Sequence, residues 1–565
     1  MLSTSLTLTL AFLGAAAPAA ATDWTPGATI PEAATVDITP QGFDAISALI
    51  PALIPSSIDI PETGGDSGSL WGCYAYLYRL TGAWVGIQVT DSSIVPQNGY
   101  LDVNADLLVN VNNASSPFTL GYELLCFDDS CGGYVEPFPV RIHTTMALDV
   151  LTASDGTTSL DATVGSFEVT YDLQPEDITL DCWVQDLEDL ADALGFSIYQ
   201  LIIDQIGGAL DSAVADLPAT LETTIEDAFS SASIEQDLDL NGVTAHLKLY
   251  PSDVKVQSEG VRLQMAGSVS ADAAACVAAY DPGGSLKTSS PPPDIGDAPA
   301  GVDSPFHLGI SLSDDFANEA IYALWRGGLL CYSLAPDNDT FPLDTSILNL
   351  LSGQAFEDIF PEAMPMSLST VPRAAPTVAY TGTHDIDVDI HELDLQMVAE
   401  LDGRMARVLT VTLNGPIGAD LNFDGTAGQL AVALDINPEV LDPSVTYNEL
   451  HAESNDAIVS SFGGALGSIL DTVLGGLLDS LSFLLPSMSG IGLQDLQTSA
   501  AGTNEDWLGA YGWIGAVTYG DGSSGCGGCG SSGSGCSGGC GTGEVPAAWS
   551  LIVPLGLLLG LRRRK

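Results

Sequence analysis

The chain has 565 residues, of which 46% are hydrophobic, so it is long and apolar enough to form two or more domains with real cores. It contains 73 Asp and Glu against 14 Lys and Arg, which gives a formal net charge of −59. Nucleic acid and anionic lipid surfaces would repel such a chain, and a nucleic-acid partner is therefore excluded.

The first 21 residues predict a secretory signal peptide. The run "LTLTLAFLGAAAPAAA" is short and apolar and ends in small residues, with Ala19-Ala20-Ala21 as the cleavage site. The preceding "MLSTS" lacks the usual Lys or Arg. We expect export, with cleavage after Ala21.

Residues 22–286 are expected to form a first α+β domain. Its opening, "TPQGFDAISALIPALI", predicts a short helix that carries Phe43, Ile46 and Ile50. Alternating segments such as "LDVNADLLVNV" predict strands between residues 71 and 180. A long helix is expected from about Val184 to Phe229, and further strands follow in "VTAHLKLY" and "VRLQMAGSV".

The segment "KTSSPPPDIGDAPAGVDSP", residues 287–305, predicts an interdomain linker because it is rich in Pro and Gly and has no periodicity. Residues 306–520 would then form a second domain of the same kind. Its strands include "HDIDVDIHELDL" and "RVLTVTLNG", and a long helix is expected from about Asp456 to Leu485. Asp471 and Asp479 argue against a transmembrane interpretation of that helix, which includes Leu477 on its apolar face.

The second domain opens with "GISLSDDFANEAIYALWRGGLL", residues 309–330, which predicts a capped helix. Ser313 is a good N-cap, and the Gly327-Gly328 pair supplies the stop. At about 100° per residue, apolar side chains that include Phe316, Ala320 and Leu324 cover roughly 200° of the circumference. Two interpretations remain open: a helix packed against two neighbours, or one that faces a sheet and an apolar ligand together.

The two domains open in similar ways, which indicates an internal duplication. Ile38, Thr39, Phe43 and Ile46 align with Ile310, Ser311, Phe316 and Ala320 or Ile321, with one gap. A curled antiparallel sheet around each pair of wide apolar helices would cover their faces and leave an inner tube.

The last 45 residues contain three segments in a fixed order. A Gly- and Cys-rich stretch (521–544) precedes an apolar run, "VPAAWSLIVPLGLLLGL", and a basic end, "RRRK". The apolar run and the basic end together predict that residues 545–565 form a transmembrane helix with a cytoplasmic C-terminus. This tail resembles the C-terminal sorting signals of Gram-negative bacteria, closest to the MYXO-CTERM kind. The resemblance implies a sorting protease, attachment at the outer membrane or cell surface, and processing near Cys526, Cys529, Cys536 or Cys540. The alternative is a plain single-pass anchor.

Six cysteines remain in the body of the chain, and an even number in an exported protein indicates disulfides. Cys126 and Cys131 are close enough in sequence for a local pair. The other four cannot be paired from sequence.

Signals for catalysis and metal binding are weak. The "GDSG" around Ser67 lacks a partner motif, and the six histidines are scattered without metal-site spacing. "DLNFDG", residues 420–425, matches half of a calcium loop, but Ala431 stands where the bidentate Glu belongs, and a hairpin turn is the favoured interpretation. We expect no enzyme, no metal and no cofactor.

Residues 35–500 resemble, in the order of their elements, the two-domain TULIP lipid-binding proteins related to bactericidal/permeability-increasing protein. The matching pieces are "TPQGFDAISALIPALI", the long helix "ADALGFSIYQLIIDQIGGALDSAV", the Pro-rich linker and "LSDDFANEAIYALWRGGLL". The resemblance implies two pseudo-symmetric domains, each a sheet wrapped about a long helix with a pocket for acyl chains. The basic tip of lipopolysaccharide-binding members is absent here.

The expected function is therefore lipid binding or transfer at the cell surface or envelope, with a lipid or another apolar small molecule as ligand. The alternative is a structural or adhesive surface protein whose apolar helices only fill cores. The predicted ligand-lining residues are Phe43, Ile46, Ile50, Phe316, Ala320, Leu324 and Leu477.

Overall fold

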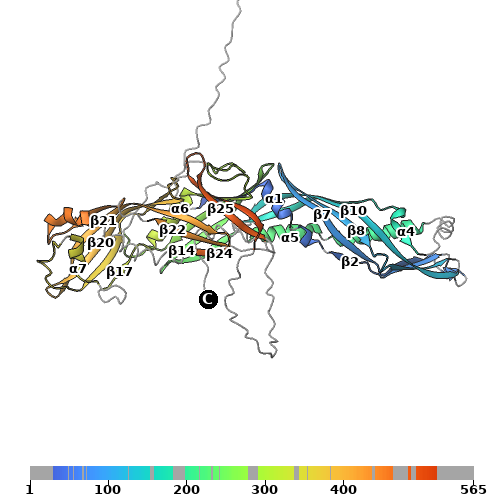
Figure 1. The fold of residues 1–565 in the computed structure, drawn as a ribbon, viewed down its shortest axis with the longest axis horizontal. Coiled ribbons are helices and arrows are strands. Elements are labelled where there is room, and N and C mark those ends of the chain that lie inside the picture. Colours follow the sequence, from blue (N-terminus) through green and yellow to red (C-terminus); the bar gives the residue numbers. More distant parts are fainter. Residues whose placement is uncertain are drawn as a thin grey trace, which may run out of the picture.

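The protein is elongated, and three antiparallel sheets follow one another along its long axis (Figure 1). The computed structural model describes residues 29–517 with gaps at 49, 55, 67–68, 71–72, 75, 125, 153–157, 182–196, 216, 231–232, 241, 278–290, 336–342, 353, 382, 436–439, 462–481 and 485–490. The predicted signal peptide and C-terminal tail lie outside these residues, as do Leu477 and the four tail cysteines.

The central sheet has seven strands and combines both halves of the chain. β1, near the start of the chain, pairs with β15 on one side and with β16 on the other. The two halves therefore share one sheet, which the prediction of two separate domains did not include. The strands in spatial order are β13 (Ile234–Leu240), β14 (Val243–Gln257), β15 (Gly260–Ala271), β1 (Ile30–Ile38), β16 (Leu308–Ser313), β26 (Trp507–Ala516) and β25 (Ile491–Ala501).

An approximate two-fold axis passes between β1 and β16. Val36 faces Ile310 across this pair, and the β14–β15 hairpin lies beyond β1 as the β25–β26 hairpin lies beyond β16. The sequence offset between Val36 and Ile310 also relates Thr39 to Ser313, and both of these are helix N-caps. The structural counterpart of Thr39 is thus Ser313, and the alignment of Thr39 with Ser311 was wrong.

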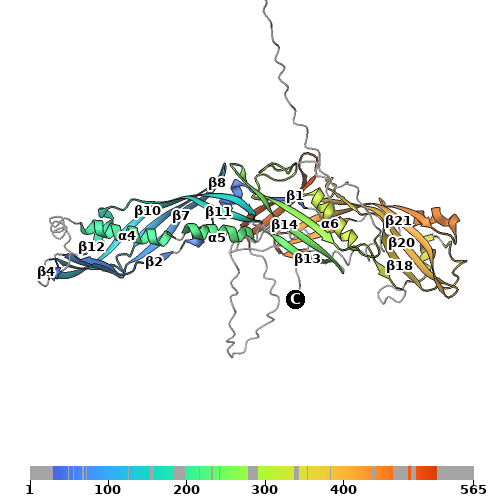
Figure 2. The same cartoon turned by 180° about the vertical axis from the view of Figure 1, so that it is seen from behind.

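The first lobe is a nine-stranded sheet with two helices along it (Figure 2). The helices are α4 (Ile198–Val214) and α5 (Leu217–Ser230), which confirms helical structure for their residues. The single long helix that was predicted is divided in two, because Ala215 lies in a turn, and residues 182–196 of that prediction lie outside the described chain. The strands are β2 (Ser57–Asp59), β7 (Trp84–Gln97), β8 (Tyr100–Val111), β10 (Phe127–Thr152), β9 (Phe118–Leu124), β6 (Tyr76–Thr81) and β3 (Thr63–Asp66), with β11 (Thr158–Tyr171) and β12 (Ile178–Leu180) paired to β10.

The second lobe is an eight-stranded sheet with α7 (Ser346–Ser352). Its strands are β17 (Ser333–Leu334), β18 (Met366–Pro372), β20 (Ile386–Leu401), β21 (Arg404–Asp424), β22 (Gln429–Asp435) and β24 (Ser482–Leu484), with β19 (Thr377–Ala379) and β23 (Asp442–Tyr447) paired to β20 and β21. Residues 455–461 are helical as predicted. The predicted end of that helix at Leu485 is wrong, because Ser482–Leu484 pairs with β22 as a strand.

The remaining elements are short. They are α1 (Pro40–Ser47), α2 (Ile50–Leu53), α6 (Asp314–Arg326), the 3-10 turns η1 (Pro175–Asp177) and η2 (Ala452–Ser454), and the small hairpin of β4 (Ser69–Leu70) and β5 (Cys73–Tyr74).

The described part of the predicted linker, residues 291–305, is bound to the central sheet. Arg262 donates to the carbonyl of Pro293, and Trp513 Nε1 donates to the carbonyl of Pro305 at 2.9 Å. Arg262 also forms a buried ion pair with Asp37, in which Arg262 Nε donates to Asp37 Oδ1 at 2.7 Å. This segment therefore covers polar groups of the sheet and is more than a tether.

Candidate functional site

The wide apolar arc of α6 is covered by protein. Ser313 caps the helix by accepting from the Phe316 N–H at 3.2 Å, as predicted. Phe316 is 0% exposed and lies with Ala320 in the core between the central sheet and the first lobe, and Leu324 packs partly buried against the same core. Two further clusters include side chains on other sides of α6. In one, Tyr322 and Trp325 pack with Ala375, and in the other the helix meets Val378 of β19 and Leu508 of β26. Asn318 also joins the helix to Val378 through two hydrogen bonds.

The predicted ligand-lining residues of the first half lie in two places. Phe43 on α1 is buried in the same large core cluster as Phe316 and Ala320, and Ile46 packs partly buried on that cluster. Ile50 on α2 packs instead on the first-lobe core. The structure thus brings five of the seven predicted residues together and places Ile50 apart, while Leu477 lies outside the described chain.

The interior of the first lobe has one apolar wall on α4. Ile202, Ile206 and Leu210 recur every four residues, which places them on one helical face, and all three are buried against the sheet. Ile203 and Val214 lie beside this face and are only partly buried. No individual residue of α4 was predicted to line a site, although the same spacing in the sequence identifies this face.

A second apolar wall is formed by β11. Phe167, Val169 and Tyr171 alternate along the strand and therefore share a face, and each is partly buried against the same core as α4. In a fully packed protein core, such side chains would be buried and packed as densely as the molecules of an organic crystal. Facing walls with apolar side chains left partly uncovered are the surroundings that an apolar ligand requires.

The second lobe has an apolar core of its own. Leu343 and Leu348 are buried together with Phe356 and Phe360, and all four belong to one core with the surrounding strands. We take the first lobe as the candidate site because α4 adds an apolar helical face to its sheet.

Tyr171 marks a polar edge of this candidate site. A Cβ added at Gly207 of α4 would lie 2.4 Å from Tyr171 Oη, so the glycine allows the hydroxyl to approach the helix. Burial raises the pKa of Tyr171, and the nearby carboxylates of Asp211 and Asp204 raise it further. Both aspartates are exposed to solvent.

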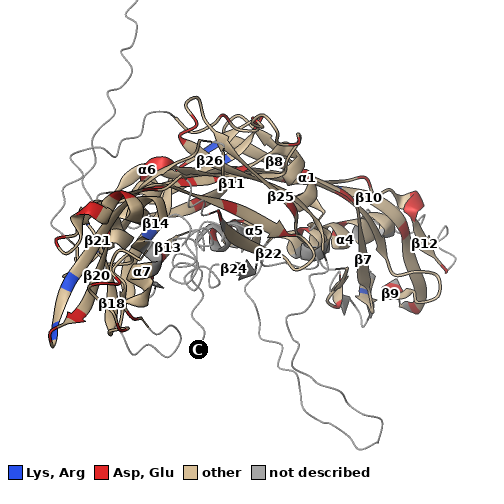
Figure 3. Cartoon of the chain, turned by 60° about the vertical axis from the view of Figure 1, so that its left-hand side comes forward, with Lys and Arg blue, Asp and Glu red and all other residues tan. Residues whose placement is uncertain are grey.

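Carboxylates engage every Lys and Arg that the structure describes in the first half. The pairs are Arg79 with Glu62 at 3.2 Å, Arg141 with Asp106 at 2.7 Å, Lys248 with Glu235 at 2.7 Å, Lys255 with Asp253 at 3.8 Å, and the buried Arg262 with Asp37. Figure 3 shows how few basic positions stand among the acidic ones. The hydrogen bond from Arg141 lowers the pKa of Asp106.

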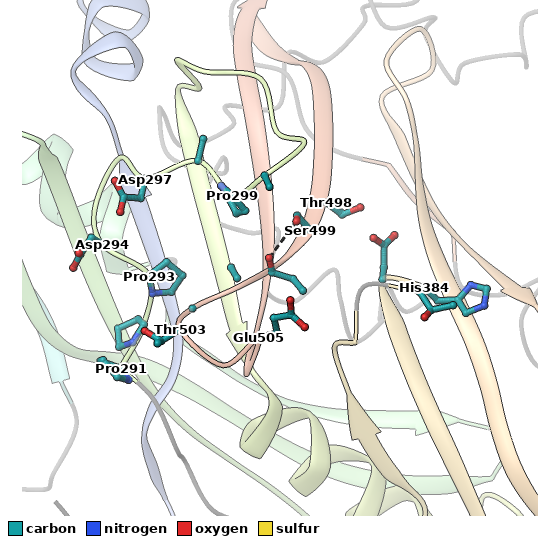
Figure 4. A pocket seen from close by; sticks show the side chains of 18 of the residues that line it. Pro291, Pro293, Asp294, Asp297, Pro299, His384, Thr498, Ser499, Thr503 and Glu505 are labelled. Atoms are coloured by element: carbon teal, nitrogen blue, oxygen red, sulfur yellow. Dashed lines mark hydrogen bonds between the residues drawn. The ribbon is translucent and has the colours of Figure 1, made fainter. Parts of the chain in front are cut away.

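A separate polar cleft of about 960 Å³ lies where the linker meets the β25–β26 loop and the second lobe (Figure 4). Its lining includes Asp294, Asp297, His384, Asp420 and Glu505, and no lining residue is Lys or Arg. His384 Nδ1 lies 3.3 Å from Asp420. Prolines and alanines of the linker and the β25–β26 loop alternate here with carboxylates, so this cleft is too polar to be the preferred site for an acyl chain.

Disulfide bonds connect separate segments of the chain. Cys276 and Cys331 form a disulfide between the segments that follow β15 and α6. Cys126 and Cys131 are also disulfide-bonded, but not to each other: the extended strand that begins at Phe127 separates them by roughly 13–16 Å, beyond the reach of a disulfide. The predicted local pair is wrong because the second cysteine lies within a strand.

The described residues give no further support to the sequence motifs considered for catalysis and metal binding. Ser67 lies outside the described residues, and Asp424 accepts from Thr426 and Ala427 in the hairpin turn between β21 and β22, which confirms the turn interpretation. Among the described residues, no group of three or more His, Cys, Asp or Glu is placed to hold a metal ion. No helix within the described part of the chain is long and apolar enough to cross a membrane.

No protein-family model matches this chain, and no curated protein does. Among solved structures, the chain is similar to lipopolysaccharide binding protein, with 13% identity, a TM-score of 0.49, and 86% of this chain and 100% of the other covered. P47 of Clostridium botulinum E1 has 9% identity and a TM-score of 0.27 over 86% and 100% of the two chains. Takeout 1 of Epiphyas postvittana has 11% identity and a TM-score of 0.17 over 29% and 78%. These scores are too low to support a functional conclusion.

Proposed function

We propose that this chain is an exported lipid-binding protein that holds acyl chains in the first lobe. The observation that carries the proposal is that Ile203 of α4 and Phe167 of β11 pack on the same apolar core and keep part of their surface uncovered. Burying an acyl chain against such walls gains about 25 cal/mol for each Å² of apolar surface removed from water.

The architecture agrees with the TULIP resemblance. The two-fold relation between β1 and β16 supports the pseudo-symmetry that the resemblance implies, whereas the sheet shared by the two halves was not part of that expectation. We propose the same place for the protein as the sequence does: export, a sorting protease acting on the tail near Cys526 to Cys540, initial attachment to the inner membrane through residues 545–565, and final location at the outer membrane or cell surface.

Of the predicted ligand-lining residues, Ile46, Ile50 and Leu324 stay candidates because they are partly buried, whereas Phe43, Phe316 and Ala320 fit core positions better. The covered arc of α6 favours the second candidate function, a structural or adhesive surface protein. Transfer of lipid between membranes is a further proposal that the first-lobe walls permit.

Native mass spectrometry of the gently extracted full-length protein tests the proposal. Wild type should carry lipid, and Ile203→Asp should lose it while the melting temperature stays within a few degrees, because a partly exposed position keeps the new carboxylate hydrated. Ile321→Asp on α6 is the matched control and should retain lipid. Lipid-free wild type, or lipid retained by Ile203→Asp, would contradict the proposal.

A further inference from the structure

We infer that the first lobe selects amphiphiles with an uncharged, hydroxyl-bearing head group and rejects those with an anionic head. The inference rests on the proposed lipid-binding function and names the class of ligand. It comes from the directions in which charged side chains point, not from the net charge alone.

Every described basic side chain of the first half points away from the apolar interior. Arg141 stands between the buried Val140 and Ile142 on β10, and Lys248 stands between the buried Leu247 and Leu249 on β14. Successive side chains of a strand point to opposite faces, so the basic residue must face outward. The same alternation holds for Arg79 and Lys255, whereas Arg262 is buried and engages Asp37 and the carbonyl of Pro293 in the linker.

Carboxylates, in contrast, line the wall formed by β11 and its two helices. Glu222 of α5 accepts from the Val164 N–H at 2.8 Å, and Glu226 accepts from the Ala162 N–H at 3.4 Å. On α4, Asp204 and Asp211 lie on either side of the point where Tyr171 Oη approaches Gly207. The described residues thus give this wall four carboxylates and no basic side chain.

The carboxylates and the Tyr171 hydroxyl interact differently with anionic and with hydroxyl head groups. An anionic head beside the wall meets like charge and finds no cation to offset its loss of hydration. A hydroxyl head donates a hydrogen bond to a carboxylate or to the Tyr171 hydroxyl, both of which accept. The acyl chain packs equally well in both cases, so the head group decides.

Displacement of the neutral fluorophore N-phenyl-1-naphthylamine from delipidated full-length protein tests the inference. At pH 7.5 and low salt, 1-dodecanol should displace the fluorophore at a concentration about tenfold lower than dodecanoate does. In Asp204→Lys/Asp211→Lys the difference should disappear, chiefly because dodecanoate binds more tightly. The control, Asp149→Lys/Asp161→Lys, makes the same charge change on a facing pair of the outer surface and should keep the wild-type difference.

Equal or stronger displacement by dodecanoate in wild type would overturn the inference. It would also be overturned if the outer-surface control changed the ratio as much as the α4 variant, because net charge would then be the cause. A fluorophore that does not bind contradicts the proposed function itself, whereas one that binds and is displaced by neither probe contradicts the head-group inference alone.

Discussion

Thr39 and Ser313 each cap a helix in one half and hold the chain of the other half. Thr39 Oγ1 donates to the carbonyl of Phe306 at 2.5 Å and lies 3.3 Å from the carbonyl oxygen of His307, and Ser313 Oγ donates to the carbonyl of Ala33 at 3.1 Å. His307 and Ala33 are related by the same sequence offset as the two caps. The hydroxyls therefore form a reciprocal clamp across the approximate two-fold axis.

Loss of either hydroxyl should destabilise the whole molecule. Thr39→Val and Ser313→Ala should each lower the free energy of unfolding by about 1–2 kcal/mol, because a cap and a buried interhalf hydrogen bond are lost together. Guanidinium unfolding followed by fluorescence measures the change. Ser115→Ala, at an exposed turn, is the control and should change little. Neutral results for both cap variants would show that the clamp is dispensable.

The buried pair of Asp37 and Arg262 should be costly to break from one side. Burial raises the pKa of Asp37 even though Arg262 works in the opposite direction, which shows how poorly the carboxylate is hydrated. Arg262→Met leaves that carboxylate without a partner and should cost about 3–5 kcal/mol, whereas Asp37→Leu/Arg262→Met should recover most of the loss. Thermal melting of the three proteins gives the comparison, and a double variant no better than the single one would contradict it.

Asp314 should make stability depend on pH. Burial, and then the carboxylates of Asp315 and Asp506, raise its pKa from 3.8 to about 7. The folded state therefore favours the protonated form, so this contribution is fully present below about pH 4 and is lost as the pH rises through about 7. Asp314→Asn should be more stable than wild type by about 1–2 kcal/mol at pH 8, after allowance for its partial exposure, and no more stable at pH 4. Urea unfolding at both pH values tests the sign.

The close approach of Tyr171 to Gly207 predicts that the effect of Gly207→Ala on stability changes sign with the residue at position 171. Gly207→Ala should destabilise wild type by about 1–3 kcal/mol, because the new Cβ meets the Tyr171 hydroxyl. In a Tyr171→Phe background the hydroxyl is gone, and the helix-forming advantage of Ala, about 1 kcal/mol, should make the same change stabilising. A double-mutant cycle with no coupling would contradict this geometry.

Local signals in the sequence predicted local structure well. The cap at Ser313, the turn at Asp424 and the alternation of β14 each depend on residues close in sequence, and the structure shows all three. The equivalence of Thr39 with Ser313 was missed because identical roles are filled by different residues. The disulfide from Cys276 to Cys331 spans 55 residues and had no local signal.

The candidate site was harder to locate from sequence. The apolar arc on α6 does not mark its buried face, because Glu319 and Tyr322 outside the arc are buried while Leu324 within it is only partly buried. The width of an arc also does not distinguish a covered helix from one that lines a cavity. That difference depends on β19 and β26, which come from distant parts of the chain. On α4 the spacing of Ile202, Ile206 and Leu210 was visible, whereas the partial exposure of its neighbours depends on how β11 curls past the helix.

The position of β1 constrains the order in which the molecule can assemble. This strand enters near the beginning of the chain, yet its two neighbours are Gly260–Ala271 and Leu308–Ser313. One edge of β1 stays unpaired until nearly half of the polypeptide has been delivered and the other edge until more than half, and such distant pairing is slow. The first described strand therefore stays without its full set of neighbours until these later segments are present. Separating the halves would leave an unpaired strand edge on each, at β1 in the first half and at β16 in the second. The central sheet therefore forms only when both halves are present.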